Sequence, residues 1–215
     1  MTHESIINLN NIKNSINSIK KDLPEIIAVS KTFQLKDIIH LIDYGHIHYG
    51  ENKVQEASAK WTEIKNSNKD IKLHMIGKLQ TNKVKIAVKL FDFIHTIDSI
   101  KLAKKIAEEQ QKINKIVKVF IQINIGNEAQ KSGVSKDDIE KLVICCKNNN
   151  LDLLGLMCIP PAKVDPSIFF KEAQKLNQNF GFKELSMGMS SDFLKACEFN
   201  STYLRIGSGI FGSRN

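Results

Sequence analysis

A series of eight short apolar runs, most of them followed by an amphipathic stretch, constrains this chain more than any other feature. Short apolar runs are typical of buried strands, and apolar residues at helical spacing are typical of helices. Strands that alternate with helices along a chain indicate a parallel sheet covered by helices. The apolar runs lie at residues 26–30, 46–49, 71–75, 92–95, 116–123, 151–157, 184–187 and 202–206.

The number of apolar runs favours a closed barrel over a doubly wound open sheet, which is the alternative. Amphipathic stretches such as 34–44 and 99–112 supply the helices between strands. A further helix is predicted within residues 1–22, because its apolar spacing ends before Pro24. The chain has no linker rich in Gly, Ser or Pro. We therefore expect one α/β domain over residues 1–215, a (β/α)8 TIM barrel at 24–212 with an additional N-terminal helix.

The charge of the chain raises the question of nucleic-acid binding. The net charge is +8, and 29 of the 31 basic residues are Lys, because only Arg205 and Arg214 are Arg. Arg supplies the planar fork that reads bases and phosphates, so this imbalance argues against specific nucleic-acid recognition. A basic RNA-binding module remains as an alternative, and solvated Lys-rich faces are the simpler explanation.

No apolar stretch is long enough to span a bilayer, and the N-terminal residues have neither the apolar core nor the cleavage site of a signal peptide. We therefore expect a cytoplasmic protein that does not enter membranes. Its cysteines lack the spacing of a metal site and are expected to be free buried thiols. They are Cys145, Cys146, Cys158 and Cys197.

Lys31 follows the first apolar run, in the segment AVSKT, where a charge is costly to bury. In a barrel of this type, functional groups gather where strands end. A lysine there attacks a carbonyl group as the neutral amine, and an apolar setting favours that form. The histidines expected at other strand ends have no carboxylate or cysteine at metal-ligand spacing, so no metal site is predicted. The expected strand ends also include His48, Glu51, Asn52, His74, His95, Met189 and Arg205.

Two loops with serine and glycine follow the seventh and eighth runs, at residues 190–191 and 207–209. Glycines let a ligand approach the backbone, and the N–H groups at the start of a helix attract anions. The loops after strands seven and eight are the usual phosphate site of this barrel. Together with Lys31 they indicate a ligand that joins a phosphate to an aldehyde. Pyridoxal 5′-phosphate satisfies both demands, and the substrate of a sugar-phosphate aldolase is the alternative.

Seven segments resemble the pyridoxal phosphate homeostasis protein family, whose single barrel is similar to the N-terminal domain of alanine racemase. They run in the family's order from residue 28 to residue 214 and cover nearly the whole chain. The segments are AVSKT, YGENKVQEA, HMIGKLQTNKVK, NIGNEAQKSGV, GLMCIP, LSMGMSSDF and LRIGSGIFGSR.

The resemblance implies a role for each matching residue. Lys31 would carry the cofactor as an internal Schiff base, and Arg205 would face its pyridine nitrogen. The phosphate would be held by Ser190, Gly207 and Ser208, and the pocket would be lined by Asn52, His74 and Met189. The chain departs from the family pattern at Lys53, where an aromatic residue is common, at Ser208-Gly209, where Thr-Ala is common, and at Asn200, where glycine is usual.

Binding of the cofactor does not by itself imply catalysis. An arginine opposite the pyridine nitrogen stays charged and only donates, so it leaves that nitrogen unprotonated and weakens the electron sink. Alanine racemases also use arginine there, but they need a second acid–base residue from an additional domain, which we do not expect in a chain that ends at Asn215. We therefore expect a non-enzymatic monomer that holds pyridoxal phosphate and buffers it or delivers it to apo-enzymes. A small amino-acid racemase is the alternative.

Overall fold

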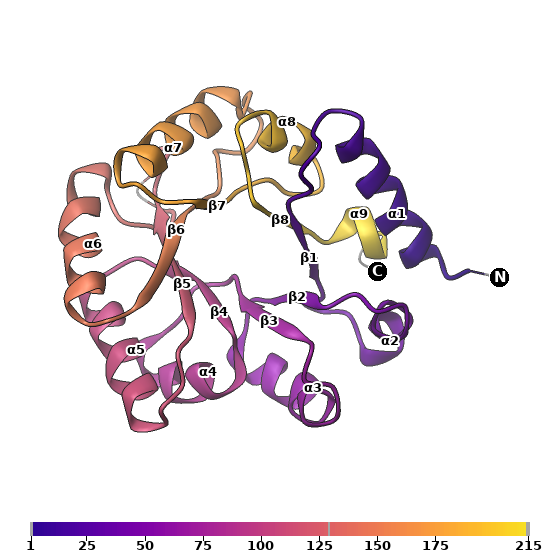
Figure 1. Ribbon diagram of the computed structural model, residues 1–215, viewed down its shortest axis with the longest axis horizontal. Coiled ribbons are helices and arrows are strands. Elements are labelled where there is room, and N and C mark those ends of the chain that lie inside the picture. The colour runs from indigo at the N-terminus through magenta and orange to yellow at the C-terminus, as the bar shows by residue number, and fades with distance from the viewer. Residues whose placement is uncertain (1, 129, 214–215) are drawn as a thin grey trace.

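Eight parallel strands close into a barrel in the computed structural model, which describes residues 2–128 and 130–213. Each strand pairs with the next along the chain, and β8 pairs with β1 to complete the ring (Figure 1). The predicted TIM barrel is therefore confirmed. The strands are β1 (Glu25–Val29), β2 (His48–Glu51), β3 (Lys72–Met75), β4 (Phe93–Ile97), β5 (Lys118–Ile123), β6 (Asp152–Cys158), β7 (Glu184–Ser186) and β8 (Tyr203–Ile206).

The helices form the outer layer of the barrel (Figure 1). The predicted N-terminal helix is present as α1, which packs against α9 and α2, and Asn8 of α1 donates a hydrogen bond to the carbonyl of Ile210 in α9 (3.1 Å). The helices are α1 (Glu4–Asn17), α2 (Leu35–Asp43), α3 (Val54–Ser67), α4 (Val84–Leu90), α5 (Ile100–Lys112), α6 (Ile139–Asn148), α7 (Ser167–Asn179), α8 (Phe193–Glu198) and α9 (Ser208–Phe211), with 3-10 turns η1 (Thr81–Lys83) and η2 (Lys136–Asp138).

Apolar side chains form two separate clusters. The larger one joins strands to the helices that cover them, with Trp61 and Phe170 among its fully buried members. The smaller one contains strand residues only and fills part of the barrel interior. Alternation of side chains along each strand explains the division, because successive residues point to opposite faces. The smaller cluster consists of Ile27, Phe93, Phe120, Met157 and Tyr203.

Local sequence signals agree with the observed boundaries. Ser99 caps α5, because its side chain accepts a hydrogen bond from the N–H of Leu102. Asn200 has φ of 60°, the left-handed conformation that Asn tolerates well. All four cysteines are buried and free, as predicted. Burial raises the pKa of Cys146 and Cys158 to about 12, so these thiols stay protonated at neutral pH.

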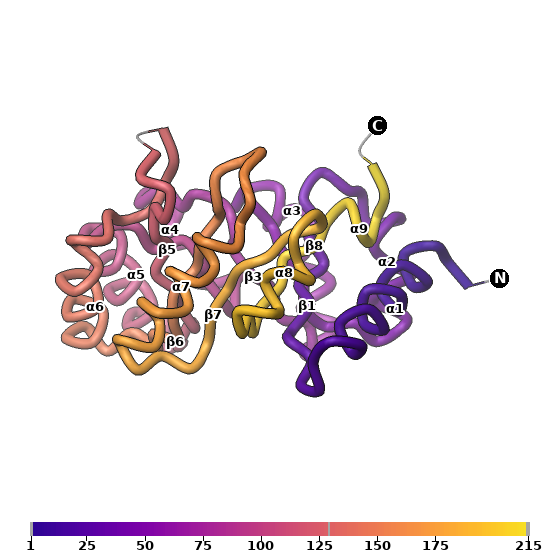
Figure 2. Tube along the Cα trace, turned by 90° about the horizontal axis from the view of Figure 1, so that it is seen from above, coloured from indigo at the N-terminus to yellow at the C-terminus, as the bar shows by residue number. Residues whose placement is uncertain are grey.

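None of the helices in the described part of the chain has both the length and the apolar character needed to cross a membrane. The loops after β5 and β6 rise on the same side of the barrel as the end of α9 (Figure 2). This side is the one at which the parallel strands end, and it carries the candidate site. Ala129 and Arg214, which belong to two of the family-like segments, lie outside the described residues.

Candidate functional site at the carboxyl ends of the strands

The predicted cofactor-binding residues come from five strands that are neighbours around the barrel: β7, β8, β1, β2 and β3. Parallel strands end at the same face, so residues that follow them share one arc of the rim. Six of these residues follow a strand: Lys31 after β1, Asn52 after β2, Met189 and Ser190 after β7, and Gly207 and Ser208 after β8. The other two lie within a strand: His74 in β3 and Arg205 in β8.

Lys31 lies in a tight turn directly after β1. It is half-buried, whereas the sequence led us to expect a buried and largely apolar setting. The next residue, Thr32, has φ of 69°, an uncommon conformation for a β-branched residue. Its N–H donates to Glu56 Oε1 of α3 (2.6 Å). This bond holds the turn, so the backbone that carries Lys31 has a defined direction.

A buried carboxylate anchors the same turn from below. Glu51 is fully buried, and its Oε1 accepts hydrogen bonds from Ser30 Oγ (2.8 Å), Lys60 Nζ (2.9 Å) and Trp61 Nε1 (2.9 Å). Lys60 also donates to the carbonyl of Ser30 (2.8 Å). These contacts, which we call the Glu51 cluster, join the ends of β1 and β2 to helix α3. They fix the residue that immediately precedes Lys31.

The two predicted phosphate loops are joined to each other and lie beside β1. The N–H of Gly209 donates to Ser190 Oγ (3.1 Å). A Cβ atom placed on Gly207 would lie 3.4 Å from Val29 Cβ, so this loop packs against the strand that leads to Lys31. Gly188 has φ of 94°, and a side chain there would lie 2.7 Å from Ala196 Cβ. Glycine is thus required at the turn that presents Ser190.

Asn52 is held in place by a close approach of two backbone segments. A Cβ atom on Gly77 would lie 2.3 Å from the Asn52 carbonyl oxygen, so only glycine fits there. The Oδ1 atom of Asn52 and the Oε2 atom of Glu51 are buried without a hydrogen-bond partner among the described residues. Buried polar atoms are normally paired, and unpaired ones fit a ligand-binding position. The residues present therefore fit a polar ligand between the end of β2 and the phosphate loops.

Arg205 reaches across the barrel interior from β8. It is 4% exposed, and its Nη1 donates to Ser186 Oγ (2.7 Å) while its Nη2 donates to the carbonyl of Cys158 (2.9 Å). Burial lowers the pKa of Arg205 from its usual value. Both contacts lie at the ends of β6 and β7. The guanidinium is thus fixed under the rim, where it can only donate hydrogen bonds.

His74 lies deeper than the sequence suggested. It is fully buried, and its two ring nitrogens are hydrogen-bonded to His48 (2.9 Å) and His95 (2.9 Å). A contact between His74 and a cofactor stays a prediction. His48 was expected at the end of the second strand, but it begins β2 and contacts Glu25 at the opposite end of the barrel. The contact among these histidines is the feature that sequence reasoning missed.

Four histidines make the stability of the protein depend on pH. Burial lowers the pKa of His46 to about 4 and also lowers the pKa of His48, His74 and His95. The unfolded chain takes up protons at these residues near pH 6.5, whereas the folded protein does not. Stability is therefore present above about pH 6.5 and is lost as pH falls toward 4, by up to about 1.4 kcal/mol per pH unit for each histidine.

Urea unfolding at pH 7.5 and pH 5.5 tests this expectation. We expect a lower unfolding midpoint at pH 5.5, and the same loss in His40→Gln, which removes an exposed histidine of α2. A midpoint that stays constant or rises at pH 5.5 would contradict it.

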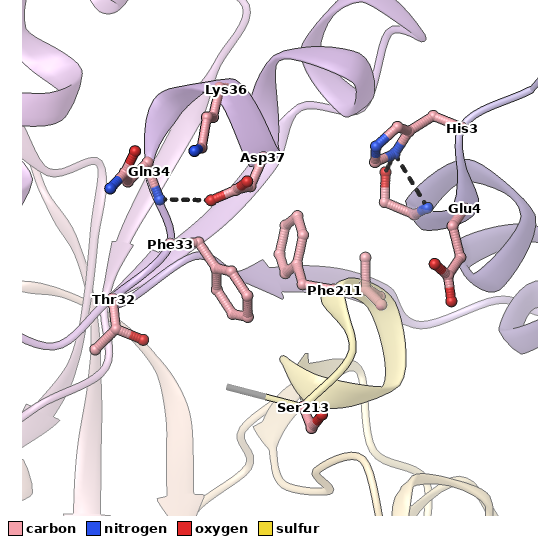
Figure 3. Close-up of a pocket in the computed structure, with 11 residues that line it drawn as sticks. His3, Glu4, Thr32, Phe33, Gln34, Lys36, Asp37, Phe211 and Ser213 are labelled. Atoms are coloured by element: carbon pink, nitrogen blue, oxygen red, sulfur yellow. Dashed lines mark hydrogen bonds between the residues drawn. The ribbon is translucent and has the colours of Figure 1, made fainter. Parts of the chain in front are cut away.

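A pocket of about 570 Å³ lies beside the rim, between α1, α2 and α9 (Figure 3). The rings of Phe33 and Phe211 pack against each other in its wall, with centroids 4.9 Å apart. Thr32 connects its wall to the turn of Lys31. None of the predicted cofactor-binding residues lines this pocket, so we do not assign the cofactor to it.

Comparison with known proteins places the chain in a family. Residues 7–215 match the family model described as "Alanine racemase, N-terminal domain". A protein from Vibrio alginolyticus named pyridoxal phosphate homeostasis protein is 37% identical over 202 residues, which are 89% of this chain and 87% of that protein. A protein of the same name from Escherichia coli K12 is 34% identical over 200 residues, with 88% and 86% covered.

Solved structures agree with this placement. PipY of Synechococcus elongatus PCC7942, determined with pyridoxal phosphate bound, is 30% identical and has a TM-score of 0.81, with 94% of this chain and 100% of that chain covered. Alanine racemase of Clostridium difficile 630 has a TM-score of 0.76 at 17% identity, with 98% of this chain and 57% of that chain covered. At this identity the second likeness shows the shared barrel fold only.

Proposed function

The chain belongs to the pyridoxal phosphate homeostasis protein family, and on this basis we propose that it binds pyridoxal 5′-phosphate and helps to control its availability. The observation that carries the proposal is the arrangement of the rim. Lys31 follows β1, and the loop at Gly207, which packs against β1, is bonded to Ser190. The lysine and the loops that we propose as the phosphate site thus follow neighbouring strands.

Each residue has a defined part in the proposed site. When bound, pyridoxal phosphate supplies an aldehyde that an amine can capture reversibly. Lys31 is the amine that forms the Schiff base, and the turn at Thr32 together with the Glu51 cluster directs it. Ser190, Gly207 and Ser208 bind the phosphate through hydroxyl and N–H donors.

The remaining residues complete the binding site around the cofactor ring. Arg205 donates to the pyridine nitrogen, while Asn52 and Met189 line the pocket, and His74 supports it from within the barrel. The unpaired Oδ1 of Asn52 supports its part in binding.

We propose that the protein holds and releases the cofactor without turning over a substrate. The names of its relatives support this role, because they describe homeostasis and not a reaction. Arg205 is compatible with this role but does not distinguish it from a racemase, since a donor opposite the pyridine nitrogen weakens the electron sink and alanine racemases also use arginine there. The same proposal has three further parts. The protein is a monomer, it works in the cytoplasm, and it passes its cofactor to apo-enzymes.

Absorption spectroscopy tests the binding proposal. We expect the purified protein to develop a saturable visible imine band on incubation with pyridoxal phosphate. The absence of this band at saturating cofactor would overturn the proposal.

Solvent-deuterium exchange separates a cofactor carrier from an amino-acid racemase. The carrier should promote exchange at the Cα of amino acids no faster than the free cofactor does. Faster exchange with any member of a broad amino-acid panel would favour the racemase.

A further inference from the structure

A hydrogen-bonded chain of side chains crosses the interior of the barrel, from Arg205 to a carboxylate at the opposite end. Each link is short: Arg205 Nη1 to Ser186 Oγ is 2.7 Å, and Ser186 Oγ to His95 Nδ1 is 2.9 Å. His95 Nε2 lies 2.9 Å from His74 Nδ1, and His74 Nε2 lies 2.9 Å from His48 Nδ1. The chain ends where His48 Nε2 lies 3.2 Å from Glu25 Oε2. We call His48, His74 and His95 the histidine relay.

The relay is closed to solvent except at its Glu25 end. His74 and His95 are fully buried and His48 is 8% exposed, whereas the side chain of Glu25 is 56% exposed. Aromatic rings hold the inner members in place. His74 stacks on Phe93 (centroids 4.2 Å apart), and His95 stacks on Phe120 (4.4 Å). The imidazoles therefore have few alternative orientations.

The Glu25 end of the chain selects the direction of donation. The Ser186 hydroxyl accepts from Arg205 and can still either donate to His95 or accept from it, whereas the ionised carboxylate of Glu25 can only accept. The order that satisfies every link has Ser186 donating to His95 Nδ1 and each imidazole donating from Nε2 to the next group. The reverse order would place an unprotonated His48 nitrogen against the Glu25 carboxylate. The structure thus favours three neutral imidazoles with the proton on Nε2.

Arg205 needs compensation that its direct neighbours do not provide. Its two hydrogen-bond acceptors, the Ser186 hydroxyl and the Cys158 carbonyl, are neutral. Within residues 2–128 and 130–213, no carboxylate forms an ion pair with it, and Asp192 acts on it only from beyond ion-pair distance. A buried cation without such a partner is costly, and hydrogen bonds in a chain polarise one another. The aligned relay turns its negative ends toward Arg205 and its positive ends toward Glu25.

We propose that the histidine relay and Glu25 are positioning residues for Arg205, which stabilise its buried charge and hold its guanidinium in one orientation by coupling it to a carboxylate across the barrel. The consequence for the cofactor rests on the proposed function, in which Arg205 faces the pyridine nitrogen. The coupling itself is a property of the protein alone. It assigns a role to the buried histidines that cofactor contacts do not explain.

The test measures histidine tautomers by ¹⁵N NMR of the imidazole rings in the cofactor-free protein at pH 7.5. We expect all three relay histidines to be neutral with the proton on Nε2. In Glu25→Gln, residue 25 no longer selects one direction of hydrogen-bond donation along the relay, because an amide donates as well as accepts. The Nδ1 signal of His95, three residues along the chain of bonds, should then shift toward the protonated position.

Glu184→Gln is the matched control, since Glu184 begins β7 at the same end of the barrel and takes no part in the relay. It should leave all three tautomers unchanged. Glu25 is exposed, so its replacement does not disturb the core. Mixed or Nδ1-protonated tautomers in the wild-type protein, or a change in Glu25→Gln confined to His48, would overturn the relay.

A cofactor titration separates this inference from the proposed function. We expect Glu25→Gln to bind pyridoxal phosphate about three- to tenfold more weakly than the wild type, and Glu184→Gln to match the wild type. Unchanged binding in Glu25→Gln would refute the positioning role. If the wild-type protein forms no imine band but shows the uniform Nε2 tautomers, the proposed function fails and the coupling stands.

Discussion

Replacing Lys31 with alanine is expected to abolish the visible imine absorbance that the wild-type protein develops with pyridoxal 5′-phosphate. The substitution removes the amine that captures the aldehyde and leaves the phosphate loops in place. Lys31 is half-buried in a turn outside the strands, so the barrel should fold without it. A difference absorption spectrum reports the loss, and circular dichroism together with thermal unfolding shows that the fold persists.

The matched control is Lys36→Ala. Lys36 is exposed on α2 and lines the pocket beside the rim, so it is a nearby lysine that is not among the proposed cofactor-binding residues. This variant should keep the full imine band. An imine band that survives in Lys31→Ala, or one that is lost in Lys36→Ala, would show that the Schiff base forms on a residue other than Lys31.

Replacing Glu51 with alanine is expected to produce the largest loss of stability among single substitutions near the site. Lys60, whose side chain is 9% exposed, would keep only Glu56 (3.5 Å) as a carboxylate partner, and Ser30 and Trp61 would each lose an acceptor. Breaking a buried ion pair from one side costs about 3–5 kcal/mol, and we expect the lower end of this range because Glu56 compensates part of the Lys60 charge. The free energy of unfolding in urea should fall by about this amount.

Two further variants isolate the cause. Glu63→Ala removes an exposed carboxylate from the same helix, α3, and should change the unfolding free energy by less than about 0.5 kcal/mol. Adding Lys60→Met to Glu51→Ala should recover part of the loss, since the buried Lys60 charge, which only Glu56 would still compensate, is then gone. A loss below about 1 kcal/mol in Glu51→Ala alone would show that the Glu51 cluster does not anchor the turn.

The strands were predictable because each has a run of apolar residues. A strand of a closed barrel is covered by helices on one side and packed against other strands on the other, so it carries few polar residues. This pattern located all eight strands to within a few residues and placed Lys31 directly after the first. The left-handed conformation of Asn200 was also predictable, because it follows from the backbone preference of a single residue.

The histidine relay was not predictable in the same way. His48, His74 and His95 are far apart in sequence, and they meet only because the stagger of the strands brings them to one path inside the barrel. The second apolar run was placed two residues too early, which put His48 at the wrong end of its strand. The inward alternation of His74 with Leu73 and Met75 was the available signal, but it does not say which inward residues touch.

The hydrogen-bond partners of Glu51 were not predictable from the sequence either. The sequence placed Glu51 only at an expected strand end, whereas the structure buries it against Lys60 and Trp61 of α3. Such a contact depends on how a helix sits on the barrel, which local sequence does not encode. The local conformation of the backbone was thus predictable from the sequence, whereas the contacts between the strands and the helices that cover them were not.

Borohydride reduction of the protein with bound pyridoxal phosphate, followed by peptide mapping, shows directly whether Lys31 forms the Schiff base. Reduction converts the Schiff base into a stable bond, so the modified lysine can be located by mass spectrometry. We expect a single peptide, the one that contains Lys31, to carry the pyridoxyl group. This modification should be absent in Lys31→Ala. A modification spread over many of the 29 lysines, or concentrated on a lysine other than Lys31, would contradict it.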